Sequence, residues 1–199
     1  MSSAPFLVKP TLEGERATLR PFTAPDIDAM GEVLADPEVL KLTGSVRTTA
    51  ETLDQPTQLD ARTRQWYETR GTEPDRLDLA IIDPATGLCV GEAVLNEWSE
   101  PDASCNFRIL IGAAGRGKGL GVEATRMLVD HAFRSTDVNR IELEVYDFNP
   151  RARHVYEQSG FVEEGRRRQA FTFDGSRIDA FIMSILREEW ERRQLGAPQ

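Results

Sequence analysis

Ten residues in the middle of the chain combine glycines and two cations in an arrangement suited to binding an anion. They read Gly112-Ala113-Ala114-Gly115-Arg116-Gly117-Lys118-Gly119-Leu120-Gly121. Apolar alternation before them predicts a strand, and helical spacing after them predicts a helix. Glycines let backbone N–H groups approach a ligand, and the helix N-terminus adds its dipole. The segment therefore predicts a loop that binds a phosphate group.

Spacing separates this segment from the dinucleotide-binding fingerprint. The fingerprint G-x-G-x-x-G needs a third glycine, but counting from Gly117 places Val122 at that position. Counting from Gly115 places Leu120 there. The segment therefore does not fit the loop that binds the pyrophosphate of NAD or FAD.

The nucleoside-triphosphate loop G-x-x-x-x-G-K-[ST] fits more closely, because Gly112, Gly117 and Lys118 match it. Gly119 stands where a hydroxyl should ligate Mg²⁺, and the loop follows a late strand instead of an early one. A Mg²⁺-dependent triphosphatase is therefore kept as an alternative. A surface turn without a ligand is a plainer alternative, but Arg116 and Lys118 at a helix start argue against it.

Two segments resemble the GNAT superfamily of acetyl-coenzyme A (acetyl-CoA)-dependent N-acetyltransferases. Residues 116–121 resemble its pyrophosphate loop Q/R-x-x-G-x-G/A at every fixed position. Residues 149–161 are similar to its N-x-x-A-x-x-x-Y-E-x-x-G-F stretch. The resemblance extends from about Glu15 to Trp190, although residues 45–76 contribute little to it. Both ends of the chain resemble the subgroup that includes ribosomal-protein N-terminal acetyltransferases, which does not fix the substrate.

The resemblance implies a fold and an activity. The fold is a mixed α/β domain whose mostly antiparallel, twisted sheet splays between two parallel strands and is flanked by helices. The activity is transfer of an acetyl group from acetyl-CoA to a primary amine, on a protein N-terminus or a small molecule, without a metal. A non-catalytic acyl-coenzyme A-binding or sensor protein is the alternative from another class.

The resemblance also implies roles for individual residues. The backbone of the strand before the loop holds the pantetheine arm of the cofactor. Tyr156 hydrogen-bonds the sulfur and protonates the leaving thiolate, unless it is only a core aromatic. Asn149 either contacts the cofactor or caps the following helix. The expected cofactor-binding residues are Ile109, Leu110, Ile111, Arg116, Gly117, Lys118, Gly119, Leu120, Gly121, Asn149 and Arg151.

The residue at the position where many relatives carry the general base differs from what the resemblance implies. An attacking ammonium must first lose a proton, and many relatives place a Glu near the start of the strand that carries the cofactor. Asn106 occupies that position here, and an amide takes no proton at neutral pH. The candidates are Glu92 or Glu97 on the preceding strand, an ordered water, or no base. His131 and His154 are expected to be ordinary helix residues.

Hydrophobic periodicity predicts the elements that position these residues. Strands are expected at 17–22, 77–82, 88–98, 105–112 and 141–145, and helices from 25 onward, within 45–76, at 122–133 and at 152–159. Turn residues at 83–87 and 100–102 predict two successive hairpins. A further hairpin is expected between 170–173 and 178–186, across Asp174-Gly175.

Length, charge and cysteine content limit the number of domains, the partners and the location expected for the protein. The 199 residues most simply form one domain, residues 1–199, with a core at about 15–190. A net charge of −9 argues against a nucleic-acid partner and favours a cationic amine. Cys89 and Cys105 are expected to be buried thiols, and no apolar stretch approaches a membrane span, so a cytoplasmic protein without a membrane partner is expected. The resemblance implies a homodimer that pairs through the C-terminal strands. Three phenylalanines of these strands suit either the paired edge or the core: Phe171, Phe173 and Phe181.

Overall fold

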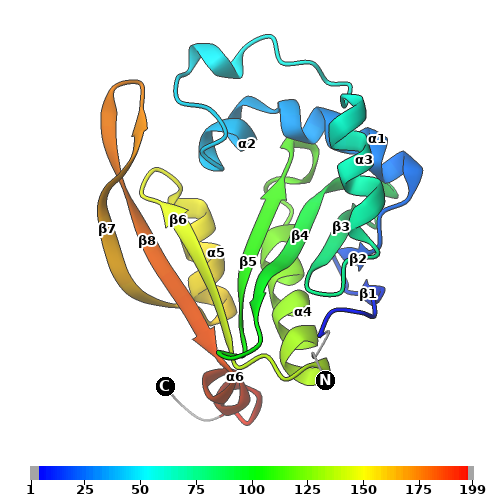
Figure 1. Ribbon diagram of the computed structural model, residues 1–199, viewed down its shortest axis with the longest axis vertical. Coiled ribbons are helices and arrows are strands. Elements are labelled where there is room, and N and C mark those ends of the chain that lie inside the picture. Colours follow the sequence, from blue (N-terminus) through cyan, green and yellow to red (C-terminus); the bar gives the residue numbers. More distant parts are fainter. Residues whose placement is uncertain (1–4, 197–199) are drawn as a thin grey trace.

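One eight-stranded sheet organises the molecule, as the computed structural model of residues 5–196 shows (Figure 1). The spatial order is β1-β2-β3-β4-β5-β6-β8-β7, and only the β5–β6 pair is parallel. The strands are β1 (Leu12–Glu13), β2 (Thr18–Arg20), β3 (Leu77–Asp83), β4 (Leu88–Ser99), β5 (Ser104–Ile111), β6 (Arg140–Tyr146), β7 (Val162–Phe173) and β8 (Ser176–Leu186). The predicted mixed α/β class with a mostly antiparallel sheet is confirmed.

The sheet splays at its centre. β5 and β6 pair only over Ser104–Asn106 and Arg140–Glu142. Both strands continue beyond this contact, and in Figure 1 they meet at the lower end and diverge upward. Past Asn106 the edge of β5 that faces β6 has no strand partner. The predicted splay therefore leaves backbone groups open along β5.

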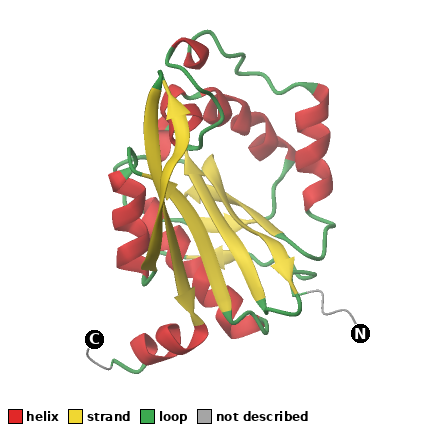
Figure 2. Ribbon diagram, turned by 60° about the vertical axis from the view of Figure 1, so that its left-hand side comes forward, coloured by secondary structure: helices red, strands yellow, loops and turns green. Residues whose placement is uncertain are grey.

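Helices cover both faces of the sheet (Figure 2). Helices α4 and α5 lie on one face, and α1 and α3 lie on the other. The helices are α1 (Ala24–Ala35), α2 (Pro37–Leu42), α3 (Ala61–Arg70), α4 (Leu120–Ser135), α5 (Pro150–Ser159) and α6 (Arg187–Gln194), with short 3₁₀ turns η1 (Ala50–Thr52) and η2 (Ala113–Gly115).

Each face of the sheet has its own apolar core. The larger core packs α4 against the sheet through fully buried side chains such as Leu128 and Phe133. The smaller one packs Ile27 and Met30 of α1 against β3 and β4. The predicted buried thiols are confirmed, since Cys89 joins the smaller core and Cys105 the larger. Burial raises the pKa of Cys105 to about 12 and that of Cys89 to about 11, so both stay protonated at neutral pH.

Local signals in the sequence set several helix ends. Thr23 and Asp26 form a capping box at the start of α1, where the acidic residue predicted a helix. Arg20 holds the buried Asp26 carboxylate in a two-pronged ion pair (2.5 and 3.0 Å). Gly160 ends α5 with a φ of +103°, a conformation that favours glycine. These residues fix where α1 and α5 meet the sheet.

The structure differs from the sequence predictions at the polar elements. β7 begins at Val162, eight residues before the predicted 170–173 segment, because its first half is exposed and lacks apolar alternation. Neither α2 nor α6 was predicted. Within 45–76 the only helices are η1 and α3, and the polar segment between them is irregular. Among the described residues, no helix is long and apolar enough to cross a membrane.

An acidic residue on β7 gives the fold a predictable pH dependence. Glu164 accepts hydrogen bonds from Arg140 (2.7 and 2.5 Å) and from the Ser184 hydroxyl (2.8 Å). The Arg140 bonds chiefly lower the pKa of Glu164 from 4.5 to about 2. Because the folded-state value lies below the unfolded one, Glu164 stabilises the fold above pH 4.5, and this contribution is lost as the pH falls toward 2. As the pH is lowered from 4.5 toward 2, we expect the Tm of Glu164→Gln to fall less steeply than that of the wild type, as measured by thermal unfolding. A decline as steep as that of the wild type would contradict this.

Candidate active site

The glycine loop connects β5 to α4, where a phosphate-binding loop is predicted. Gly117 (φ +77°) and Gly119 (φ +79°) adopt left-handed conformations that favour glycine. Gly119 is the N-cap of α4, and no side chain caps the first N–H groups of this 16-residue helix. A side chain at Gly117 would meet no atom within 4 Å. The loop therefore presents open backbone N–H groups at the positive end of a helix.

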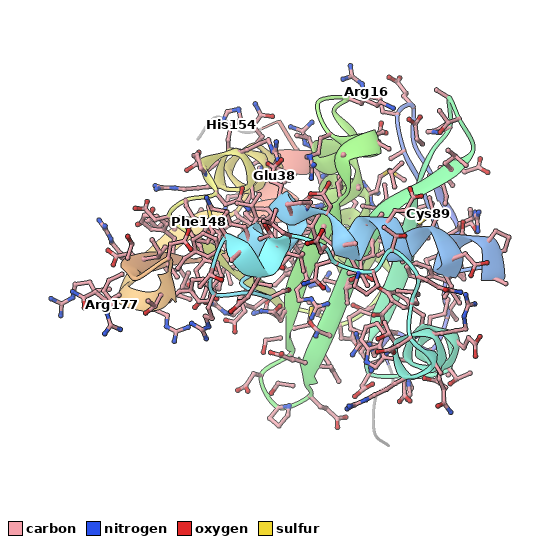
Figure 3. The ribbon with its side chains drawn as sticks, turned by 90° about the horizontal axis from the view of Figure 1, so that it is seen from above. Arg16, Glu38, Cys89, Phe148, His154 and Arg177 are labelled. Atoms are coloured by element: carbon pink, nitrogen blue, oxygen red, sulfur yellow. The ribbon has the colours of Figure 1, made fainter. Side chains whose placement is uncertain are left out.

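Arg116 fastens the loop to the start of α2. Its guanidinium donates to both carboxylate oxygens of Asp36 (3.1 and 2.7 Å) and to the Ile111 carbonyl (3.3 Å). Burial alone would raise the pKa of Asp36, but Arg116 and the backbone N–H groups of α2 hold it below its usual value. Glu38 lies between the start of α5 and the loop, where it pairs with both Arg151 (2.6 Å) and Arg116 (3.3 Å) (Figure 3). This network sets the position of the loop relative to α2 and α5.

Lys118 of the loop and Arg153 of α5 also have carboxylate partners. Lys118 Nζ lies 2.8 Å from Asp83 Oδ2 on β3. Arg153 pairs with Glu157 (3.2 Å) and Glu163 (2.7 Å). The backbone N–H groups of the loop therefore remain open to an anion, and the Arg16 guanidinium lies beside them at Gly119.

A cavity of about 1000 Å³ extends from this loop along the open edge of β5 to α3. Its walls come from α1, α2, α3, β4, β5, β6 and α5 as well as the loop. The predicted site residues that line it are Glu92, Ile109, Leu110, Ile111, Arg116, Gly117, Gly119, Leu120, Gly121, Asn149, Arg151 and Tyr156. Lys118 and Glu97 are the two predicted residues outside its lining. Segments more than a hundred residues apart in the sequence thus build one cavity.

Tyr156 and Asn149 each have a structural role and also line the cavity. Tyr156 is buried in the larger core, with its ring packed edge-on against Phe107 at 6.1 Å, and it also lines the cavity. Burial raises the pKa of its hydroxyl, which keeps the proton available for donation. Asn149 caps α5 by accepting the N–H of Ala152 (3.1 Å), and it too lines the cavity.

Glu92 is a buried carboxylate at the α3 end of the cavity. Only 2% of the residue is exposed, and its Oε2 atom has no hydrogen-bond partner among the described residues. Tyr67 of α3 lies beside it, and Arg108 Nη2 lies 3.6 Å from Oε1. Burial raises the pKa of Glu92, and the Arg108 charge opposes this shift. A buried carboxylate with a raised pKa and one oxygen free of hydrogen bonds has the character of a general base.

Glu97, Asn106 and the two histidines are weaker candidates for the base than Glu92. Glu97 sits in a β-bulge of β4 with a φ of +55°, exposed and outside the cavity lining. Asn106 lines the cavity at the point where β5 and β6 part. His154 lies on the outer side of α5 (Figure 3), and its ring contacts Gln158 (3.0 Å). His131, on α4, contacts Ser135 (3.3 Å), so neither histidine reaches the cavity.

Most residues of the cavity wall were not named as site residues from the sequence, among them Trp66 and Tyr67 of α3 and Arg108 of β5. The two aromatics were visible as the only large anchors of the polar 45–76 segment. Their packing, with ring centroids 5.0 Å apart, gives no periodic signal. Strand alternation places Arg108 and Glu92 on the same sheet face, since Arg108 pairs with Val94 and Glu92 with Leu110. That register was not readable from the sequence.

The class of the protein follows from its family. The chain matches the family described as Acetyltransferase (GNAT) domain over residues 16–162, and it belongs to this family. The predicted acetyltransferase class, which uses acetyl-CoA, is thereby confirmed. Because the chain belongs to this family, the alternative interpretation as a Mg²⁺-dependent triphosphatase is not supported. Within residues 5–196 no group of three or more His, Cys, Asp or Glu side chains is placed to hold a metal ion.

Curated relatives include enzymes with different acceptors. A spermidine N(1)-acetyltransferase of Vibrio cholerae is 31% identical over 57% of this chain, and the match spans 65% of that relative. A candidate ribosomal N-acetyltransferase of Bacillus subtilis is 36% identical over 64% of this chain and 66% of its own length. An uncharacterized N-acetyltransferase of Bacillus licheniformis is 26% identical over 90% of this chain and 98% of its own length.

Solved structures share the fold. The spermidine N-acetyltransferase of Vibrio cholerae, in complex with CoA and spermine, gives a TM-score of 0.73 at 23% identity over 89% of this chain and 99% of that chain. A GCN5-related N-acetyltransferase from Brucella melitensis gives 0.73 at 22% identity over 96% of this chain and 85% of that chain. The architecture of this protein is therefore that of the family.

Proposed function

We propose that this protein transfers the acetyl group of acetyl-CoA to a primary amine, with Glu92 as general base and Tyr156 as general acid. The observation that carries the proposal is the single cavity linking the glycine loop to a buried carboxylate. Relatives that carry acetyl to spermidine, and a structural neighbour in complex with CoA, support the donor and the amine class.

The loop and β5 form the donor end of the cavity. The open N–H groups of residues 117–121 and the α4 dipole suit the pyrophosphate of acetyl-CoA. The free edge of β5 beyond Asn106 suits an amide-rich arm, as it would another strand. Arg116 holds the loop against α2, which is a positioning role. The fit rests on backbone groups that the fold leaves without partners.

Glu92 and Tyr156 divide the proton chemistry between the two ends of the reacting centre. Glu92 accepts a proton from the substrate ammonium, and the freed amine attacks the thioester carbonyl. The N–C bond forms, the C–S bond breaks, and Tyr156 gives its proton to the departing thiolate. The attacking nitrogen loses its second proton, which replaces the one lost by Tyr156, and the proton held by Glu92 passes to solvent. The net products are an N-acetyl amine, free coenzyme A and one proton. Burial keeps Tyr156 protonated and raises the proton affinity of Glu92, as these roles require.

Removing the Tyr156 hydroxyl tests the acid. We expect Tyr156→Phe to lower kcat by at least about 10²-fold, because the thiolate would leave without a proton donor. The aromatic packing against Phe107 is kept, so Tm and the Kd for acetyl-CoA should stay near wild type. The measurement is steady-state release of the coenzyme A thiol at saturating amine. A variant with unchanged kcat would assign the residue to the core alone.

The same assay separates the enzyme from a non-catalytic acyl-coenzyme A sensor. A sensor would bind acetyl-CoA, yet release no thiol with any amine. The buried carboxylate of Glu92, which lines the cavity and has a raised pKa, favours the enzyme, since a protein that only binds an acyl group has no need of a proton acceptor there.

Three finer expectations stay predictions: the homodimer, the cytoplasmic location and a protein N-terminus as acceptor. The homodimer would not use the three C-terminal phenylalanines as an exposed edge, because Phe171, Phe173 and Phe181 are buried. The strand at this end of the sheet is β7, whose exposed first half remains for pairing. A cytoplasmic location and acetylation of a protein N-terminus likewise await experiment.

A further inference from the structure

A charged pair marks the acceptor end of the cavity. Glu92 and Arg108 lie on the same face of β4 and β5, with Arg108 Nη2 at 3.6 Å from Glu92 Oε1. This separation is longer than a hydrogen bond. The Glu92 side chain is 3% exposed, whereas half of the Arg108 side chain is exposed. The carboxylate thus lies at the bottom of the site and the guanidinium toward its opening.

The guanidinium of Arg108 has donors to spare. Within residues 5–196 it makes no hydrogen bond, and Glu92 is its one ion-pair partner. Its other charged neighbour is Arg70, which carries the same charge. The two other arginines that line the cavity near the loop are occupied, Arg116 by Asp36 and Arg151 by Glu38. A guanidinium with free donors in a cavity is suited to a two-pronged bond with a carboxylate.

The carboxylates of this half of the cavity offer little to a second cation. Glu144 is held by Arg167. Asp60 caps α3 and accepts the N–H of Thr63 (2.6 Å). Glu92 is the buried acid of this half, with Tyr67 beside it and Arg108 as its ion-pair partner. A polyamine would bring a second positive charge toward that guanidinium, which is unfavourable.

We infer that the acceptor is a free amino acid, whose ammonium faces Glu92 and whose carboxylate is bound by Arg108. This inference rests on the proposed function and names its substrate class. The amine and carboxylate of an amino acid are separated by one carbon, which matches two partner groups 3.6 Å apart. Both charges of the substrate then face opposite charges, and the long Glu92–Arg108 contact is replaced by two complementary ones. The local charge, not the overall −9, therefore selects the acceptor.

The test compares three acceptor classes on the wild-type protein: the common amino acids, the same amino acids as carboxamides, and spermidine. Coenzyme A thiol release gives kcat/KM for each, and calorimetry gives the Kd for acetyl-CoA. We expect at least one amino acid to exceed its carboxamide and spermidine by about 10²-fold or more, because a site built to bind a carboxylate rejects analogues that lack it.

Arg108→Gln supplies the matched variant. We expect its KM for the preferred amino acid to rise at least about 10-fold, with KM for the carboxamide and the Kd for acetyl-CoA nearly unchanged. Arg177→Gln, which removes the same charge from an outward-pointing side chain on the β7–β8 hairpin (Figure 3), should leave all these constants as in the wild type. Partial recovery in Arg108→Lys would agree with a charge-dependent contact.

Two outcomes overturn the inference while the donor assignment survives. One is acetyl-CoA binding with equal or better turnover of carboxamides or spermidine, and the other is acetyl-CoA binding with turnover of none of the three classes. Loss of acetyl-CoA binding itself in the wild type would instead reject the proposed function.

Discussion

Glu92→Gln is expected to lower kcat by about 10²–10⁴-fold, the range that a positioned general base contributes. The amide keeps the size of the side chain but takes no proton. The Kd for acetyl-CoA should remain near wild type, because the proposed pyrophosphate donors are the backbone N–H groups of residues 117–121, whereas the neighbours of Glu92 are Tyr67 and Arg108. Tm at neutral pH should not fall, since burial makes the charged carboxylate costly there. The measurement is kcat under saturating donor and acceptor.

The pH profile gives an independent readout of the same residue. Burial raises the pKa of Glu92 above its usual value of 4.5, so the rate should rise with pH through that elevated pKa. Glu92→Gln should lose this acidic limb. The parallel variant Glu97→Gln decides between the two carboxylates named from the sequence. A large loss of kcat in Glu97→Gln, with little change in Glu92→Gln, would reverse the assignment.

Gly117→Asp is expected to weaken acetyl-CoA binding by about 10- to 100-fold, as seen in its Kd. Gly117 faces open space at the N-terminus of α4, so a carboxylate there would repel a bound pyrophosphate at short range. Asn and Asp tolerate a left-handed backbone better than other residues, which limits the strain at φ +77°. The measurement is calorimetric titration with acetyl-CoA.

Gly117→Asn is the matched control for this change. It has the same shape and the same backbone demand but no charge, so its Kd should stay much closer to wild type. Equal weakening in both variants would show that the glycine is needed for space or flexibility. Neither variant weakening the binding would place the pyrophosphate away from this loop.

The donor end of the site could be predicted from the sequence because its signals are local. A strand, a run of glycines and a helix start are all contained in residues 105–133, and their geometry follows from backbone rules. The open N–H groups at Gly117 and Gly119 are where that pattern places them. The sequence could not show that Arg116 and Lys118 are held by Asp36 and Asp83, because those partners lie 80 and 35 residues away.

The acceptor end could not be predicted because it is built by register and by a polar helix. Glu92 could be named only together with Glu97, since the bulge that turns Glu97 out of the cavity leaves no signature in the residues. Arg108 looked like an ordinary strand residue until β4 and β5 were paired. α3 buries Tyr67 against this face although most of its residues are polar, so periodicity did not mark it as part of a wall.

Calorimetric titration of the wild-type protein with acetyl-CoA, and separately with ATP and Mg²⁺, tests the central claim most directly. The structure predicts that acetyl-CoA binds with one site per chain and that ATP with Mg²⁺ gives no comparable heat. Absence of acetyl-CoA binding, or binding of ATP that strengthens with Mg²⁺, would contradict the assignment of this loop and cavity to the acetyl donor.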